Sequence, residues 1–271
     1  MTYYFVIFEI LVYLLFIVCL LHARQRGPAA IWQLLAGVAY GLLLEWATIQ
    51  QLHAYQYGRF LLMVGDLPLA VGVAWGVIIY SVMLVSQGSS LPEWAQPVLD
   101  GVLALNIDLA MDAVAIRLGM WDWGLGFTQQ YFGVPYTNFW AWFWVVFSFS
   151  LGLRIFRHAP NAVVRRWAPA GAILIGLVGV TGTNAFITGV VSPNGHLVTI
   201  LVLLGTALSL LLWLRPKFSV DRLALPAFLV PLCFHAYFLS AGLLSGALIR
   251  TPFLLAVSLA MLFLALYWER H

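Results

Sequence analysis

The stretch "DLPLAVGVAWGVIIYSVMLVS" (66–86) decides the fold, because its last twenty residues contain no charged side chain. A helix rises about 1.5 Å per residue, so about twenty apolar residues cross a hydrocarbon core of about 30 Å. The stretch lacks the alternation of polar and apolar residues that is typical of a membrane β-barrel strand. Only a helix then satisfies its backbone groups within lipid. We therefore predict a membrane-spanning helix here.

Similar apolar runs recur along the whole chain. Of its 271 residues, 63% are hydrophobic and 8% are charged, and the mean hydropathy is +0.96. Soluble proteins average about 25% charged residues. We expect an all-α, polytopic integral membrane protein with about eight or nine transmembrane helices, forming a single domain over residues 1–271. The expected helices cover residues 2–22, 29–52, 66–86, 97–118, 137–157, 168–191, 196–214, 223–246 and 249–268.

The first apolar run differs from a secretory signal peptide. It has no basic region before it, it contains Glu9, and "HARQRGP" (22–28) follows it in place of a small-residue cleavage site. We expect it to be retained as a helix. Cys19 and Cys233 both lie within apolar runs, so we expect them to act as small buried hydrophobic residues without a disulfide.

The distribution of basic residues predicts the orientation. Ten of the thirteen, Arg154 among them, follow the odd-numbered expected helices, whereas Arg59, Arg117 and Arg250 lie on the other side. Cytoplasmic loops carry an excess of Lys and Arg. We therefore expect an external N-terminus and a cytoplasmic C-terminus in a bacterial or archaeal cytoplasmic membrane. No basic run is interleaved with aromatic residues, so we expect no nucleic-acid partner.

The acidic residues gather on one side of the membrane. With this topology, six of the ten lie in or beside its outer half: Glu9, Glu45, Asp66, Asp108, Asp112 and Asp122. A carboxyl group inside a membrane helix is costly to bury and usually marks a functional site. The clustering therefore predicts a site near the outer surface.

Asp108 and Asp112 form the centre of the predicted site. They are four residues apart and share one face of the expected helix over 97–118. Two carboxyl groups this close cannot easily both ionise in an apolar environment, so one is expected to stay protonated as an acid. The alternative is a hydrogen-bonded pair that only joins neighbouring helices. With Glu45 expected nearby, the pattern favours acid catalysis.

Four other polar residues are candidates for roles in structure or in the chemistry of the site. Asp66 precedes an expected helix and either caps it or takes part in the chemistry, and Asn138 has the same two roles at the next outer helix start. We expect Glu9 to point into a solvated interface. We expect His235 to be a hydrogen-bonded packing histidine. Asp122, in the outer loop, completes the supporting candidates with Asp66 and His235.

Aromatic residues are concentrated between Trp121 and Trp144, where they occupy eleven of twenty-four positions. A belt of aromatic residues at the membrane interface explains part of this excess. Flat rings also suit an extended polyene and stabilise a cation by cation–π attraction. The substrate-binding candidates are Trp121, Trp123, Phe132, Tyr136, Trp140 and Trp142.

Several classes of membrane protein are excluded or disfavoured. The single lysine, Lys217, lies in a loop, which excludes a retinal Schiff base, and the six histidines lack the spacing of di-iron enzymes. The stretch "NIDLAMD" (106–112) resembles an Asp-rich metal motif of intramembrane prenyltransferases, but Asp221 is the single aspartate of the second half of the chain. We therefore expect no metal and no cofactor.

Four sequence blocks, in their order and spacing, resemble the carotenoid biosynthesis protein family. The blocks are "YGLLLEW" (40–46), "YQYGRFLLMVGDLPLAVGVAWGVIIY" (55–80), "DLAMDAVAIRLGMWDWG" (108–124) and "YFGVPYTNFWAWF" (131–143). The resemblance covers about residues 40–145. It implies that Glu45, Asp108, Asp112, Trp121, Trp123, Gly133, Pro135 and Asn138 occupy family motif positions. The chain departs from the usual pattern at Ala113, where proline is common, and at Ala141, where glycine is common.

The resemblance implies a carotenoid hydratase. Characterised members of the family add water to the terminal double bond of acyclic carotenoid ends, such as those of lycopene, γ-carotene and bisanhydrobacterioruberin. On chemical grounds we expect Asp112 or Asp108 to be the general acid, the other aspartate or Glu45 to stabilise the cation, and Asn138 to orient water.

Three other functions remain open at this point. The first is a carotenoid- or lipid-binding subunit of a pigment–protein complex, and the less favoured ones are a prenyltransferase and a transporter. The expected partners are a carotenoid or other long isoprenoid, membrane lipid, and other membrane proteins of pigment synthesis.

Overall fold

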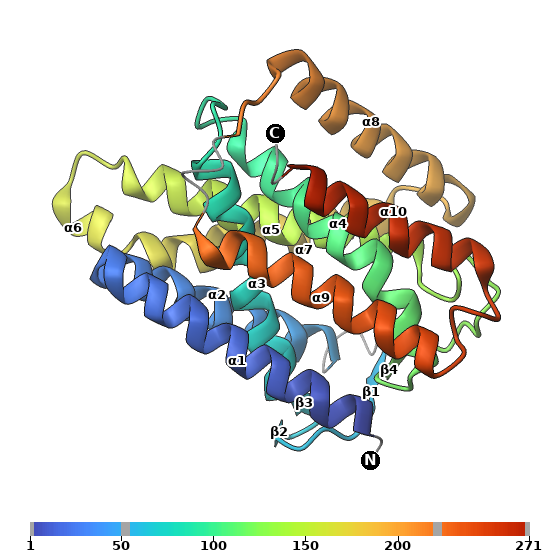
Figure 1. Ribbon diagram of the computed structural model, residues 1–271. Coiled ribbons are helices and arrows are strands. Elements are labelled where there is room, and N and C mark those ends of the chain that lie inside the picture. The colour runs from blue at the N-terminus through green and yellow to red at the C-terminus, as the bar shows by residue number, and fades with distance from the viewer. Residues whose placement is uncertain (1–2, 50–54, 219–223, 269–271) are drawn as a thin grey trace.

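The computed structural model describes residues 3–49, 55–218 and 224–268, and Figure 1 shows them as a bundle of helices. It is 76% helical with almost no sheet, which confirms the predicted all-α polytopic membrane fold. The bounds of the long helices are α1 (Tyr3–Arg26), α2 (Pro28–Ala47), α3 (Leu69–Gln87), α4 (Gln96–Arg117), α5 (Tyr136–Arg157), α7 (Ala168–Gly189), α8 (His196–Leu214), α9 (Leu225–Leu244) and α10 (Pro252–Trp268).

These bounds agree closely with the predicted apolar runs, because the thickness of the hydrocarbon core sets the length of each span. The predicted end of the second run is the least accurate: the run is predicted to extend to residue 52, whereas α2 ends at Ala47. Positions 50–52 of the run lie outside the described residues. Within the described ranges, seven helices are long and apolar enough to cross a membrane, whereas α10 is shorter. Helix α4 has similar length but contains Asp100, Asp108 and Asp112.

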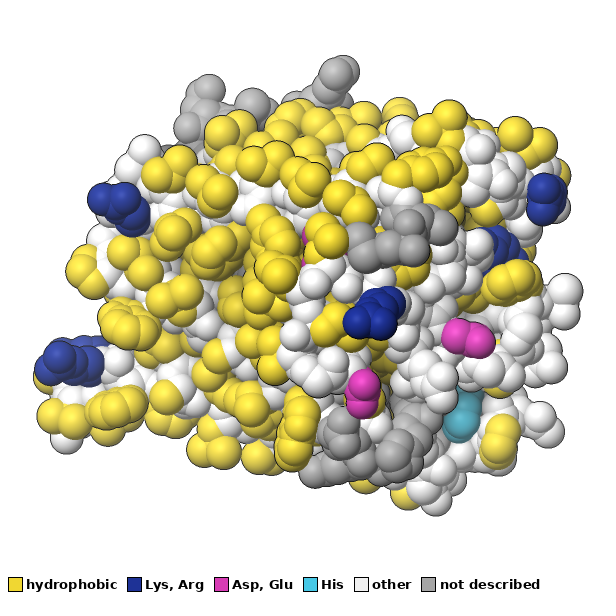
Figure 2. Space-filling model, turned by 90° about the horizontal axis from the view of Figure 1, so that it is seen from below, with side chains coloured by type: hydrophobic (Ala, Val, Ile, Leu, Met, Phe, Trp, Pro, Cys, Tyr) yellow, Lys and Arg dark blue, Asp and Glu magenta, His cyan; other side chains and the backbone are white. Residues whose placement is uncertain are grey.

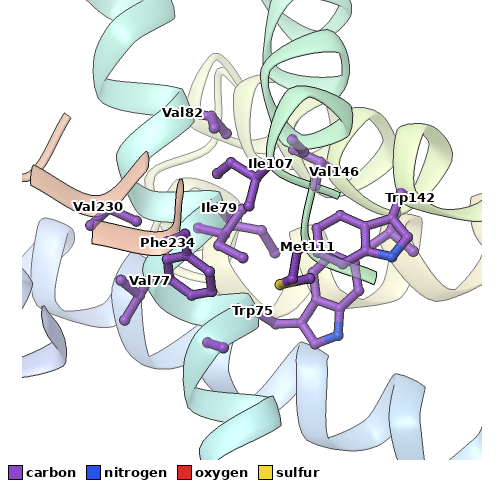
Figure 3. Close-up of a cluster of buried hydrophobic side chains, with 14 of the residues drawn as sticks. Trp75, Val77, Ile79, Val82, Ile107, Met111, Trp142, Val146, Val230 and Phe234 are labelled. Atoms are coloured by element: carbon purple, nitrogen blue, oxygen red, sulfur yellow. The ribbon is translucent and has the colours of Figure 1, made fainter. Parts of the chain in front are cut away.

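Helix α3 lies at the centre of the bundle. Every residue from Ala70 to Ser86 is buried, and α1, α2, α4 and α9 all pack against this helix. Figure 3 shows part of this core, where side chains of α3 meet Ile107, Met111, Trp142 and Phe234 of the neighbouring helices. The uninterrupted apolar sequence of α3 is therefore explained by contact with protein on all sides.

Glycines bring α2 and α3 into close contact. Gly37 and Gly41 of α2 face Gly72 and Gly76 of α3, so each helix presents two glycines four residues apart. A Cβ atom on Gly41 would lie 2.4 Å from the Cβ atom of Trp75, which leaves no room for a side chain. Small residues allow such close backbone approach in membrane helix pairs. This contact fixes the position of Trp75.

The outer surface is largely apolar. Figure 2 shows one face on which hydrophobic side chains predominate and charged side chains are few and separate. Helix α8 lies at the edge of the bundle, and its Leu212 and Trp213 are 72% and 74% exposed (Figure 1). Such side chains are stable when they contact lipid. Among the described residues both cysteines are free, with Cys19 buried and Cys233 partly buried.

Short strands join two loops at one end of the bundle. Strand β1 (Gln56–Tyr57), which follows α2, pairs antiparallel with β4 (Trp121–Asp122), which follows α4. Strands β2 (Met63–Val64) and β3 (Leu67–Pro68) form a hairpin immediately before α3. A five-residue helix, α6 (Ala162–Arg166), lies near the opposite end, between α5 and α7. The β1–β4 pair therefore closes the end of the bundle at which α2 and α4 finish.

A buried ion pair joins α4 and α5. Arg154 Nη1 lies 3.1 Å from Asp100 Oδ2, and both side chains are buried. Arg154 also donates hydrogen bonds to Gln96 and Ser86. Arg154 lies in the last turn of α5, within the expected helix over 137–157, where Asp100 compensates its charge. Counting it with the loop residues that follow this helix is therefore wrong. Hydropathy alone cannot distinguish a paired arginine from a loop arginine.

We predict that Arg154→Met lowers the free energy of unfolding by about 3–5 kcal/mol, because it leaves the Asp100 carboxyl buried without a cation. Thermal unfolding of the purified protein in detergent, followed by near-ultraviolet circular dichroism, measures this loss. The control is Arg166→Met, because Arg166 is exposed in α6. Replacing both partners, as Asp100→Leu with Arg154→Met, is expected to recover part of the loss. Equal unfolding temperatures for the two single variants would contradict the prediction.

Candidate functional site

A cavity of about 650 Å³ lies between the C-terminal halves of α2, α4 and α7 and the N-terminal halves of α3 and α5. Its wall is mostly apolar, with contributions from Val71, Ile78, Val145 and Phe234. Three of the four residues that the sequence predicts to be catalytic also line the cavity: Glu45, Asp112 and Asn138. The cavity therefore places acidic groups beside a space suited to an apolar ligand.

Asn138 connects the two aspartates of α4. Its amide nitrogen lies 2.7 Å from Asp112 Oδ2 and 3.1 Å from Asp108 Oδ2. All three side chains are buried. An amide NH₂ group has two hydrogens, so it can donate one to each carboxyl group. Asn138 therefore does not cap α5, although it lies in the first turn of that helix, where Pro135 is the N-cap residue.

The two carboxyl groups lie close enough for the single Asn138 amide to bind both. Two carboxyl groups this close in a buried site cannot easily both ionise, so one of them is expected to keep a proton. Asp112 lines the cavity, whereas Asp108 lies behind it and contacts the cavity through Asp112 and Asn138. The pair can supply a proton to a ligand in the cavity.

Glu45 is held by three donors on the cavity wall. The Tyr57 hydroxyl and the Trp75 indole N–H donate to its two oxygens, each at 2.7 Å, and the Tyr55 hydroxyl donates to the same carboxyl group. These bonds come from α3 and from the loop after α2. The carboxyl group of Glu45 is therefore fixed in position on the side of the cavity formed by α2.

Tyr55 and Tyr57 stay protonated over a wide pH range. Both belong to the loop after α2, and their burial beside Glu45 raises the pKa of each hydroxyl well above the usual value of 10.0. They therefore remain hydrogen-bond donors at pH values where exposed tyrosines ionise. Sequence reasoning missed these two residues and Trp75, because only the β1–β4 pairing and the α2–α3 contact bring them to Glu45.

Three of the six predicted aromatic residues line the cavity. Trp121 and Trp123 enter it from β4 and the following loop, and Trp142 enters it from α5. The ring of Trp142 lies 4.2 Å from that of Trp75, measured between centroids. These rings surround the space next to Glu45 and Asp112.

Phe132, Tyr136 and Trp140 are not among the residues that line the cavity. The indole N–H of Trp140 donates to the Thr183 carbonyl at 3.0 Å, which turns this residue toward α7. Phe132 packs on Phe253 of α10. Sequence spacing alone cannot show which rings of an aromatic segment line a cavity.

The supporting candidates lie apart from the cavity. Asp66 is exposed in the β2–β3 turn and does not cap α3, whose N-cap residue is Pro68. Asp122 is exposed and accepts a hydrogen bond from the backbone N–H of Gly124 at 2.8 Å, which stabilises its own turn. His235 is buried in α9 and lies 2.9 Å from Asn106 Oδ1, as expected for a packing histidine.

The predicted position of Glu9 is wrong, because Glu9 is fully buried. Its carboxyl group accepts the backbone N–H groups of Leu61 and Leu62 at 2.6 and 3.1 Å. These N–H groups belong to the loop that also carries Tyr55 and Tyr57. Their need for an acceptor explains why Glu9 turns inward, and the contact anchors this loop on α1.

Arg117 anchors the second loop. Its guanidinium donates to the Phe132 carbonyl at 2.8 Å and to the Phe127 carbonyl at 3.0 Å. Both acceptors lie in the segment between α4 and α5 that carries Trp121 and Trp123. This segment, which covers one end of the cavity with Trp121 and Trp123, is therefore fixed to α4.

Among the described residues, no group of three or more His, Cys, Asp or Glu side chains is arranged to hold a metal ion. Asp221, His53 and His271, which entered the sequence argument about metal motifs, lie outside the described residues. The polar groups that line the cavity are carboxyl, amide, phenol, indole and threonine hydroxyl groups.

A model of a protein family, described as carotenoid biosynthesis protein, matches residues 1–212 of the chain. The match extends well beyond the blocks at 40–145 in both directions and includes most of α8. It therefore includes every described segment that lines the cavity except α9. No curated protein and no solved structure matches the chain.

We predict that Glu9→Gln speeds hydrogen exchange at the amides of Leu61 and Leu62 by about tenfold or more. A hydrogen bond to a charged group is worth about 1.5–3 kcal/mol, and glutamine offers one neutral acceptor oxygen in place of two. Hydrogen–deuterium exchange mass spectrometry of the purified protein measures the rates. Asp122→Asn, in the other loop, is the control and is expected to leave them unchanged. Unaltered exchange in Glu9→Gln would rule out the anchoring role.

Proposed function

The chain belongs to the carotenoid biosynthesis protein family, and we propose that it is a hydratase that adds water to the terminal C=C bond of an acyclic carotenoid. The observation that carries this proposal is the pair of buried carboxyl groups, Asp108 and Asp112, that the Asn138 amide bridges at the wall of an apolar cavity. Hydration of an isolated alkene begins with protonation of carbon, which requires an acid within contact of the double bond.

Asp112 is the general acid in this proposal, because it lines the cavity and Asp108 does not. Its proton forms the new C–H bond at the less substituted carbon as the π bond breaks. The positive charge then lies on the tertiary carbon. Water attacks that carbon, and the surplus proton of the water returns to the aspartate pair. The pair is regenerated, so the net reaction is alkene plus water giving a tertiary alcohol.

Glu45 and the aromatic rings stabilise the intermediate cation. The Glu45 carboxyl is fixed by Tyr55, Tyr57 and Trp75 and has no freedom to turn away. When ionised, it provides the negative charge that a carbocation needs in a site of low dielectric constant. The face of Trp142 adds cation–π attraction from the α5 side. Neither group needs a metal or redox cofactor.

Polar atoms on the wall support a place for the attacking water. Trp123 Nε1 and Asn184 Oδ1 are buried and have no hydrogen-bond partner among the described residues, and both residues line the cavity. A buried polar atom without a protein partner is commonly satisfied by bound water. Asn138, whose NH₂ group binds the aspartates, also lines the cavity and is suited to orient that water.

We predict that Asp112→Asn reduces hydration by about 100-fold or more, because removal of a general acid costs about 10²–10⁴-fold. Asp108→Asn is expected to have a similar effect, because it leaves Asp112 without the carboxyl partner with which it holds and recovers the proton. The test is expression in a bacterial host that makes lycopene, followed by mass spectrometry of the extracted pigments. Asp66→Asn and Asp122→Asn are matched controls, since both carboxyls are exposed in loops at the same end of the bundle. The controls are expected to retain the wild-type product.

Pigment heavier by one or two waters in the wild type, and absent from the two α4 variants, would support the proposal. Lycopene that co-purifies unchanged with the wild-type protein would instead indicate a pigment-binding subunit. Full hydration by Asp112→Asn would exclude this residue as the acid.

We also predict that Glu45→Gln lowers kcat by about 10²-fold, the effect typical of losing one electrostatic contact to a transition state. Tyr57→Phe is expected to lower kcat by about tenfold at most, because Tyr55 and Trp75 still hold Glu45. Initial rates in proteoliposomes separate kcat from KM. A change confined to KM in Glu45→Gln would show that Glu45 only shapes the cavity.

A further inference from the structure

The cavity wall has an opening on one side. Its lining residues on α7 include Thr181, Ala185 and Thr188, and all three are exposed at the molecular surface. On the facing side, the α2 residue Ala47 and the adjoining Thr48 line the cavity and are half-buried. The lining residues contributed by α1, α3, α4 and α9 are buried.

The opening lies between α2 and α7, above the point where these helices meet. Gly176 of α7 packs on the Tyr40 ring, and a Cβ atom at this glycine would lie 2.8 Å from Tyr40 Cε2. Tyr40 is fully buried and donates a hydrogen bond to the Val145 carbonyl at 3.2 Å, so the contact is fixed. The lining residues that both helices contribute all lie C-terminal to this contact. The helices are therefore joined below the cavity and leave its side open.

The surface around this opening suits lipid better than water. Trp46 of α2 and Phe186 of α7 are 54% and 46% exposed, and Val178, one turn below the opening, is 63% exposed. The end of the bundle, by contrast, is covered by the loops that carry Tyr55, Tyr57 and Trp121. The cavity is therefore open toward an apolar side of the bundle and covered by loops at the end of the bundle.

We propose that the gap between the C-terminal halves of α2 and α7 is a lateral portal for one end of a long apolar chain. This inference rests on the proposed function and identifies how its substrate is held. The reactive end enters the cavity from the bilayer, while the rest of the isoprenoid passes between Ala47 and Ala185 and stays in lipid. Each binding event then presents one end of the molecule to Asp112. The enzyme therefore recognises the chemical structure of that end and makes no contact with the other end.

The test compares two tryptophan substitutions on α7. Ala185→Trp fills the portal, whereas the control Val178→Trp places the same indole side chain at an exposed position that does not line the cavity. Each protein is reconstituted in lipid nanodiscs with lycopene as the probe. Bound lycopene is measured by its visible absorbance per protein, and hydration is measured by mass spectrometry. Unfolding temperatures establish that both variants are folded.

We expect Ala185→Trp to lower bound lycopene by about fivefold or more and to slow hydration by about tenfold or more. Val178→Trp is expected to stay within about twofold of the wild type in both measurements. Wild-type binding and turnover in Ala185→Trp would overturn the portal and leave the hydratase proposal intact. Lycopene that binds without hydration, and is lost in Ala185→Trp, would support the portal and refute lycopene hydration. Absence of both binding and turnover in the wild type would overturn both proposals.

Discussion

Burial of carboxyl groups inside a helical bundle is the constraint on which the rest of the structure depends. A carboxyl group in an apolar interior is destabilising unless hydrogen bonds compensate it. The compensating donors come from different parts of the chain: Asn138 of α5 for the aspartates, and Trp75 of α3 with two loop tyrosines for Glu45. Each acid therefore joins elements that are distant in sequence. The hydrogen bonds that compensate the buried carboxyl groups also hold the helices of the site together.

Helix α4 is where this constraint is most severe. It carries Asp100 near one end and the Asp108–Asp112 pair beyond its middle, so it would be unstable alone in lipid. Helices α3, α5, α9 and α10 pack around it and supply partners along its length, Arg154 for Asp100 and Asn138 for the pair. The most polar helix thus becomes an interior element. Apolar helices such as α8 take the lipid-facing positions.

The sequence predicts the helices well and the contacts of the site only in part. Span lengths follow from membrane thickness, and the shared face of Asp108 and Asp112 follows from the helical repeat, so both are local properties. The partners of Glu45 depend on β1 pairing with β4, which joins loops separated by two helices. Glu9 likewise accepts hydrogen bonds from backbone N–H groups about fifty residues away in the sequence. No local pattern contains such long-range contacts.

The cost of the aspartate pair is itself an argument about function. A protein that only stored a polyene would be better served by apolar residues at positions 108 and 112, since these pack without burying carboxyl groups. Protonation of an alkene has the opposite requirement. Its acid must hold a proton in a site from which bulk water is excluded, because water would compete for the proton and the cation. The buried pair, bridged by Asn138 and facing an apolar cavity, satisfies that requirement at the expense of stability.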